Sequence, residues 1–138
     1  MKNCIIAPDV VSAQADVVGS KLAGGRIELY PGVQPEDVDE DFLPRTPIMV
    51  FELNSPAFSK ARDGRIDLYP VAPAKVQNPG KITWGRAFSA QGRGLMDFSV
   101  GEREHLFDMV IDKTEARVGK ELVIVSFSHT VPTSSEGW

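Results

Sequence analysis

The stretch KITWGRAFSAQGRGLMDFSV, residues 81–100, decides the fold class. Its first half places large side chains at every second position, namely Ile82, Trp84, Arg86 and Phe88. A period of two is that of a β-strand, whose successive side chains alternate between two faces. The GRG at residues 92–94 predicts a tight turn, because glycine adopts the left-handed backbone conformations that such turns require. With the run LMDFSV that follows it, this stretch predicts an antiparallel hairpin.

Short runs with strand character recur on both sides of this hairpin, separated by Gly and Pro. They lie at residues 25–30, 47–53, 64–69, 105–111 and 121–131. In the last run the residues predicted to share one face are Val123, Val125, Phe127 and Val131, with His129 among them. Seven or eight short strands broken by turn signals are typical of a sandwich or barrel. We therefore predict an all-β fold, a small jelly-roll-type β-sandwich of about eight strands.

One helix is predicted, at residues 10–23, where apolar side chains fall on one stripe and Gly24-Gly25 provides a stop. With no other helix to make crossovers, a parallel α/β fold is disfavoured. The length of 138 residues fits a single domain over residues 1–138, and we expect flexible termini at 1–9 and 133–138.

The sequence also contains an internal echo. GRIELYP at residues 25–31 and GRIDLYP at residues 64–70 each follow a lysine by the same spacing. Two copies are too few for a repeat array. We interpret them as two strands in similar edge positions, each ended by proline, with an ancestral duplication as the alternative.

The composition excludes several classes of partner. The formal net charge is −4 and the pI is about 5.1, which argues against binding to nucleic acid. No apolar run approaches the ~20 residues of a membrane span, and the short N-terminal apolar stretch does not fit a signal peptide. We therefore expect no membrane partner and synthesis in the cytoplasm. Cys4 is the only cysteine, so an internal disulfide is excluded.

No motif predicts catalysis or a cofactor. The acidic segment at residues 36–41 has calcium-like spacing, but an EF-hand loop would need glycine and glutamate where Phe42 and Ile48 stand. His105 and His129 are too few for the clustered ligands of a cupin-type metal centre. No nucleophile elbow, phosphate-binding loop or dinucleotide fingerprint occurs. We predict that the protein is not an enzyme and has no metal, catalytic or cofactor-binding residues.

The aromatic residues divide into core candidates and one outlier. Five occupy strand positions, and we expect core packing for four of them: the five are Trp84, Phe88, Phe98, Phe107 and Phe127. Trp138 instead follows the polar residues 133–137. A large aromatic side chain is costly to leave in water, so Trp138 is either an anchor on a partner or part of a disordered tail.

The order of strands and turns resembles a family of small tailed-phage proteins over about residues 15–132. The segments that carry the resemblance are GGRIELYPG (24–32), SPAFSKA (55–61), ITWGRAF (82–88), GLMDFSVG (94–101) and VSFSHTVP (125–132). The family is that of the capsid cementing (decoration) proteins, to which the cementing protein of a Bordetella phage belongs. The middle of this chain is richer in Lys and Arg than the family pattern.

The resemblance implies a jelly-roll protein on the exterior of an icosahedral capsid, where it would bridge neighbouring major capsid subunits. Its partners would be the major capsid protein and a second copy of itself, since two-fold dimers are the commonest oligomers. The termini would reach these partners, which makes Lys2, Ile5 and Trp138 candidate contacts. One alternative is a carbohydrate- or receptor-binding β-module of a tail fibre or spike. A solvent-facing platform of Trp84 with Tyr30 or Tyr69 would favour it. The other alternative is a small cupin-like or hydrolytic enzyme, which requires the two histidines to converge in space.

Overall fold

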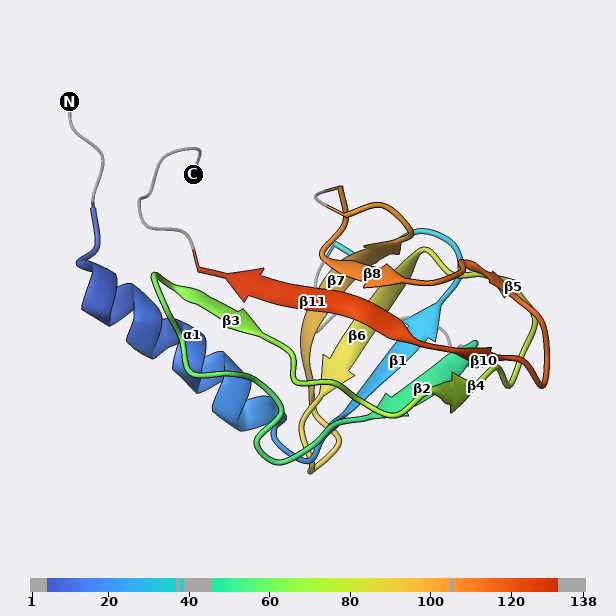
Figure 1. Cartoon of the computed structure of the whole chain (residues 1–138), viewed down its shortest axis with the longest axis horizontal. Helices are drawn as coiled ribbons and strands as arrows, with labels where there is room; N and C mark the ends of the chain where they lie inside the picture. The colour runs from blue at the N-terminus through green and yellow to red at the C-terminus, as the bar shows by residue number, and fades with distance from the viewer. Residues whose placement is uncertain (1–4, 37, 39–45, 105, 132–138) are drawn as a thin grey trace.

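The structure, a computed structural model, describes residues 5–36, 38, 46–104 and 106–131 (Figure 1). Within these residues one helix precedes eleven strands. In chain order they are α1 (Pro8–Leu22), β1 (Arg26–Tyr30), β2 (Met49–Glu52), β3 (Arg65–Asp67), β4 (Ala74–Lys75), β5 (Gly80–Lys81), β6 (Trp84–Phe88), β7 (Gly94–Gly101), β8 (Met109–Ile111), β9 (Glu115–Ala116), β10 (Glu121–Leu122) and β11 (Ile124–Thr130). The predicted all-β, sandwich-like fold with one short N-terminal helix is confirmed.

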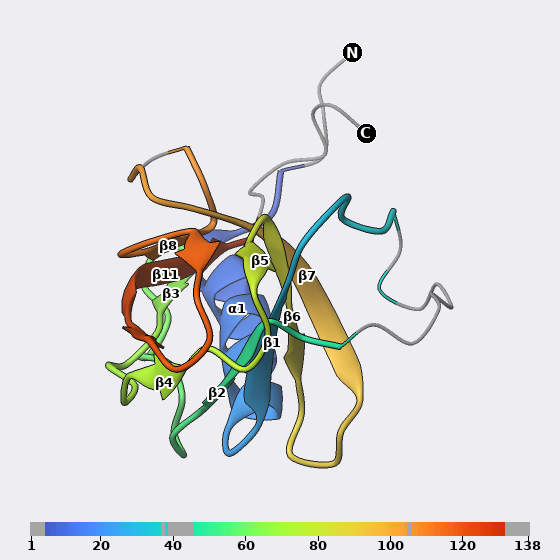
Figure 2. The same ribbon diagram turned by 90° about the vertical axis from the view of Figure 1, so that its right-hand side faces the viewer.

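Seven of the strands form one curled sheet in the order β2-β1-β6-β7-β8-β11-β3. The sheet bends into half a barrel, so that its two halves face each other as the layers of a sandwich do (Figure 2). The predicted hairpin joins β6 to β7, with Gly92 in the left-handed conformation at φ +87°. Strands β7 and β8 run parallel, unlike the other paired strands of this sheet. Two short pairs, β10-β4 and β5-β9, complete the described sheets.

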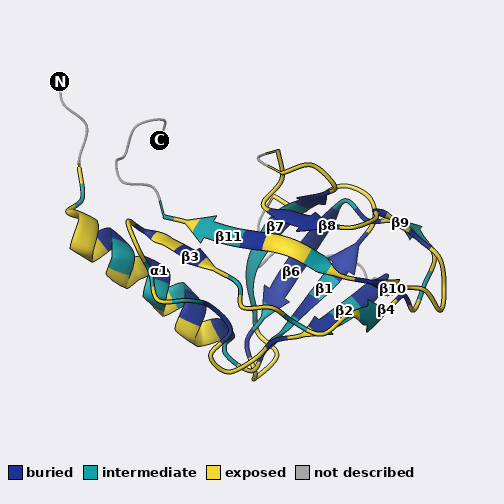
Figure 3. Cartoon of the chain, viewed as in Figure 1, coloured by how far each residue is buried: buried dark blue, intermediate teal, exposed yellow. Residues whose placement is uncertain are grey.

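Helix α1 begins two residues earlier than predicted. Pro8 and Asp9, which we expected in a flexible N-terminal extension, form its first turn, because proline at the start of a helix loses no intrahelical hydrogen bond and its φ suits the helix. The residues that face the sheet are Val11, Ala15, Gly19 and Leu22. Successive members of this set are three or four residues apart, which is about one helical turn, so they form one stripe along the helix. This stripe is the buried face of α1 in Figure 3.

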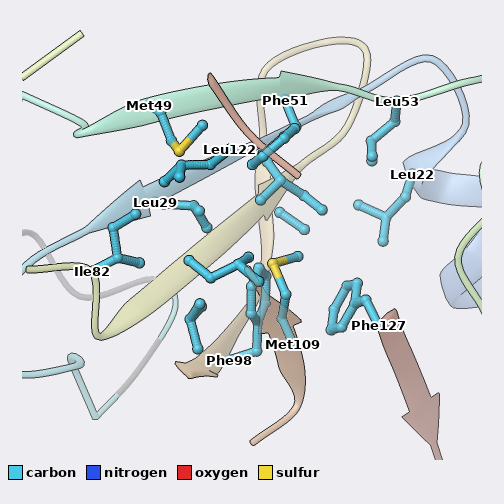
Figure 4. Close-up of a cluster of buried hydrophobic side chains, with 14 of the residues drawn as sticks. Leu22, Leu29, Met49, Phe51, Leu53, Ile82, Phe98, Met109, Leu122 and Phe127 are labelled. Carbon is cyan, nitrogen blue, oxygen red and sulfur yellow. The ribbon is translucent and has the colours of Figure 1, made fainter. Parts of the chain in front are cut away.

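The main core lies between the halves of the curled sheet (Figure 4). Met49 and Phe51 from β2 face Met109 from β8 and Phe127 from β11, and all four are at most 3% exposed. Phe98 and Phe127 pack with ring centroids 4.6 Å apart. Leu122 from the short β10 also joins this cluster. The core therefore draws on strands from the whole length of the chain, which makes the described residues one packed unit.

The last predicted strand alternates differently from the prediction. Phe127 is buried, but Val123 and Val125 are 36% and 54% exposed. The pairing of β11 with β8 shifts register between Ile124 and Ser126, and such an irregularity moves the following side chains to the opposite face. The shared face predicted for Val123, Val125 and Phe127 is therefore wrong.

The two copies of the internal echo occupy unlike places in the sheet. β1 is paired on both sides, with β2 and β6, whereas β3 ends the seven-stranded sheet. The interpretation as two similar edge strands is wrong for β1. What the copies share is local: Ile27 and Ile66 are both fully buried, and Arg26–Glu28 and Arg65–Asp67 are both ion-paired.

Candidate functional site

Of the three predicted partner contacts, the described residues include one. Ile5 is 76% exposed just before α1, as a contact residue requires. Lys2 and Trp138 lie outside the described residues, as do His105, Cys4 and most of the acidic segment at 36–41. These predictions stay predictions.

The part of the chain that the structure describes contains no group of three or more His, Cys, Asp or Glu side chains placed to hold a metal ion. Within it, His129 is half-buried, and every buried side-chain nitrogen or oxygen atom has a hydrogen-bond partner. The convergence of two histidines that would signal a cupin-like enzyme involves His105 and so falls outside the described residues.

The pair Tyr30 and Trp84 is stacked but does not face solvent. Their ring centroids are 4.8 Å apart with 21° between the planes, yet Tyr30 is 3% and Trp84 1% exposed. The Tyr30 hydroxyl donates a hydrogen bond to Glu28, and burial, reinforced by this carboxylate, raises the pKa of Tyr30 well above its usual value. These two rings are therefore a structural stack and not a sugar-binding platform.

Arg86 and Asp97 form a buried ion pair beside this stack. Arg86 Nε donates a hydrogen bond to Asp97 Oδ1 at 2.6 Å, and Arg86 Nη2 donates one to Asp97 Oδ2 at 2.9 Å. This bidentate geometry is typical of the planar guanidinium group of arginine. The side chains are 7% and 6% exposed. Side chains alternate along β6, so Trp84 and Arg86 lie on one face of the strand and Ala87 lies on the other. Ala87 belongs to the main core. The pair thus fixes β6 to β7 from the other side of the sheet.

Two exposed apolar side chains belong to the β7–β8 loop, of which the structure describes residues 102–104 and 106–108. Leu106 is 65% exposed and Phe107 39%. Of the five aromatic residues at predicted strand positions, four of which we expected in the core, Phe107 is the exposed one. Its ring lies over Gly101, where a Cβ would come within 2.2 Å of the ring. Residue 101 must therefore be glycine for Phe107 to hold this position.

Two carboxylates fasten the base of the β7–β8 loop. Asp108 Oδ2 accepts hydrogen bonds from the backbone nitrogen of Ser99 at 3.1 Å and from its hydroxyl at 3.2 Å, and Asp108 N donates to that hydroxyl at 3.0 Å. At the other end Glu102 Oε2 accepts from Thr114 N at 2.9 Å and Thr114 Oγ1 at 2.6 Å. These hydrogen bonds lower the pKa of Glu102. These hydrogen bonds fix the first and last residues of the loop, Glu102 and Asp108.

A second exposed apolar strip lies on α1. Val10 and Val17 are 47% and 52% exposed and lie seven residues, or about two turns, apart, so they share the outer face of the helix. Ile5 immediately precedes this helix. Figure 1 shows α1 at one end of the long axis and the β7–β8 loop away from it, above β8. The β7–β8 loop and the outer face of α1 are therefore two separate regions with exposed apolar side chains.

His129 is expected to make the free energy of unfolding depend on pH. Burial lowers its pKa below the usual value, against a smaller opposing effect of the Asp108 carboxylate. The unfolded chain then binds a proton more readily than the folded one, so the free energy of unfolding is expected to fall as the pH drops below about 6.5. Urea titrations of the wild type and of His129→Gln between about pH 7.5 and 5 measure this, with a shallower decline in the variant. Equal declines would show that His129 does not contribute.

We expect the fold to be independent of metal ions, because packed apolar side chains and paired polar groups hold the described core together. The melting temperature should be the same in EDTA, in buffer and with added Ca²⁺. Since bound metal stabilises a folded state by mass action, a rise in the melting temperature with Ca²⁺ or a fall in EDTA would contradict this expectation.

Comparison with known proteins finds no matching family model, no similar curated protein and no similar solved structure. In the described part of the chain, no helix has the length and apolar character needed to cross a bilayer.

Proposed function

We propose that the protein is a non-catalytic structural component of a phage virion. It binds the outer surface of the icosahedral capsid and cements neighbouring major capsid subunits, stabilising the shell. The starting point is the resemblance of its strand-and-turn order to the capsid cementing proteins. The observation that carries the proposal is the β7–β8 loop, which presents Leu106 on a base fastened at both ends.

An exposed apolar side chain in a loop with fixed ends suits a protein whose function is attachment. Burying a Leu side chain on a partner is worth about 1.5–3 kcal/mol relative to leaving it exposed. Because the hydrogen bonds of Asp108 and Glu102 already fix the two ends of the loop, less conformational entropy is lost there on binding. Leu106 is thus placed as an anchor for an apolar pocket on a capsid subunit.

Cementing requires contacts with more than one neighbour. The β7–β8 loop supplies one contact, and the α1 strip of Val10 and Val17, continued by Ile5, supplies the second. Each contact is small, but linking the two makes the second binding step intramolecular, which strengthens overall attachment. The same logic favours a homodimer, which would double the number of contacts. We propose the major capsid protein and a second copy of the chain as partners.

The charge of the protein fits an exterior position. With a formal net charge of −4 it has no basic footprint for packaged DNA. We therefore propose that it is made in the host cytoplasm, joins the outside of the shell, and contacts neither nucleic acid nor membrane.

The test uses capsid shells assembled from the major capsid protein encoded alongside this chain, without the chain itself. The purified protein is expected to sediment with these shells saturably, and the decorated shells to withstand a higher temperature before they break. Failure to sediment with the shells would contradict the proposal, as would saturation with no gain in shell stability.

A further inference from the structure

A groove of about 400 Å³ lies between the C-terminal half of α1 and the segment after β2. Its volume is near the lower end of the range for small-molecule sites, about 300–1,000 Å³, so it has room for one or two small rings. Its lining residues are Asp16, Gly19, Ser20, Ala23, Pro56, Phe58, Ser59, Lys60 and Tyr69. It is separate from the β7–β8 loop, and none of its lining residues is a proposed capsid contact, although α1 contributes to both regions.

The lining combines an aromatic ring with polar groups of three kinds. Tyr69 is 42% exposed and lines the groove, so part of its side chain is open to a ligand. Asp16 provides a carboxylate, Ser59 a hydroxyl and Lys60 an ammonium group. Pro56 and Phe58 add apolar surface. A ligand that fits must therefore have an apolar face and a rim of groups that both donate and accept hydrogen bonds.

Two polar side chains of the groove, Asp16 and Ser59, are held in place by hydrogen bonds. Asp16 Oδ1 accepts a hydrogen bond from Ala61 N at 2.7 Å, which leaves the second carboxylate oxygen for a ligand. Ser59 Oγ accepts from Asp67 N at 3.1 Å, which leaves its hydroxyl proton to donate. Tyr69 N donates to Ala57 O at 2.9 Å and so fixes the backbone under the ring. Such preorganisation reduces the entropy lost on binding.

The internal echo indicates what the Tyr69 ring can do. Its counterpart in the first copy, Tyr30, stacks on Trp84 and is buried. In the second copy the tyrosine stands at the same place in GRIDLYP, but no aromatic ring in the described parts of the chain is stacked on it, and it faces the groove. The tyrosine ring that stacks on another ring in the first copy is therefore available to a ligand in the second copy.

We propose that this groove binds a saccharide unit. The C–H face of a pyranose ring would stack on Tyr69, while its hydroxyls donate to the Asp16 carboxylate and accept from Ser59 and Lys60. A purely apolar ligand would leave these polar groups desolvated and unpaired, which is costly. The protein would thus carry, in addition to its capsid contacts, a weak sugar site on the virion surface.

The test is an NMR titration of the ¹⁵N-labelled full chain with D-glucose, D-galactose, N-acetyl-D-glucosamine and L-rhamnose. We expect saturable shifts of the Ser20, Lys60 and Tyr69 amides for at least one sugar, with Kd on the order of 1–10 mM, because the contact surface is small. Tyr69→Ala should weaken binding at least tenfold, whereas Tyr69→Phe, which keeps the ring, should change it less than threefold. Lys60→Ala, at an exposed side chain, gives a second variant that does not threaten the fold and should also weaken binding.

The proposal is overturned if none of the four sugars shifts these amides, or if the shifts lie elsewhere on the protein. It is equally overturned if folded Tyr69→Ala or folded Lys60→Ala binds as the wild type does. Sedimentation of Tyr69→Ala with capsid shells should be unchanged, so loss of sugar binding and loss of capsid attachment are separate outcomes.

Discussion

Asp97→Asn is expected to lower the free energy of unfolding by about 3–5 kcal/mol, the usual cost of removing one partner from a buried ion pair. The asparagine has nearly the same shape as the aspartate, so the packing of β7 is kept. What changes is that the Arg86 guanidinium, whose side chain is 7% exposed, loses the negative charge of the Asp97 carboxylate, 2.6 Å from its Nε. Urea denaturation at pH 7, followed by tryptophan fluorescence, measures the change.

The control is the equivalent change in an exposed pair. Arg65 and Asp67 are ion-paired at 3.0 Å, but their side chains are 57% and 54% exposed. Solvent screens such a pair, so Asp67→Asn should cost no more than about 1 kcal/mol. Similar losses in the two variants would contradict the structural role assigned to the Arg86–Asp97 pair.

Leu106→Asp is expected to weaken attachment to capsid shells by at least about 30-fold while leaving the melting temperature unchanged. A central anchor residue typically contributes about 2 kcal/mol or more to an interface, and an aspartate would add the cost of burying a charge. Because Leu106 is 65% exposed, the substitution removes little packing from the folded protein. Quantitative sedimentation with shells gives the affinity.

Val118→Asp is the matched control for this measurement. Val118 is 62% exposed, close to the value for Leu106, but lies between β9 and β10, near the opposite end of the molecule from α1 (Figure 3). The same apolar-to-acidic change there should leave attachment within about threefold of the wild type. If both variants bind equally well, or equally poorly, the β7–β8 loop is not the anchor.

Local patterns in the sequence predicted the elements well, because they depend on neighbouring residues alone. The stripe at residues 10–23 gave α1 to within two residues at each end, and GRG at 92–94 gave the β6–β7 turn. The strand order, the parallel pairing of β7 with β8 and the irregularity at Val125 depend on which distant segments pair. No local period contains that information.

The candidate sites were harder to predict for the same reason. The β7–β8 loop is fastened by contacts between residues nine and twelve apart, and its polar residues gave no motif. The position of Phe107 depends on the small size of Gly101 beneath its ring, which a search for aromatic residues overlooks. Tyr69 could have been found, since the echo pairs it with Tyr30, but only the structure separates the exposed ring from the buried one.

The copy number of the chain in purified virions tests the central claim most directly. A cementing protein that bridges capsid subunits should be present at a number close to that of the major capsid protein, measured by quantitative mass spectrometry of intact particles. A tail-fibre or spike module would be present in only a few copies per particle. Near-equal stoichiometry is therefore the predicted result, and a few copies or none would contradict the capsid role.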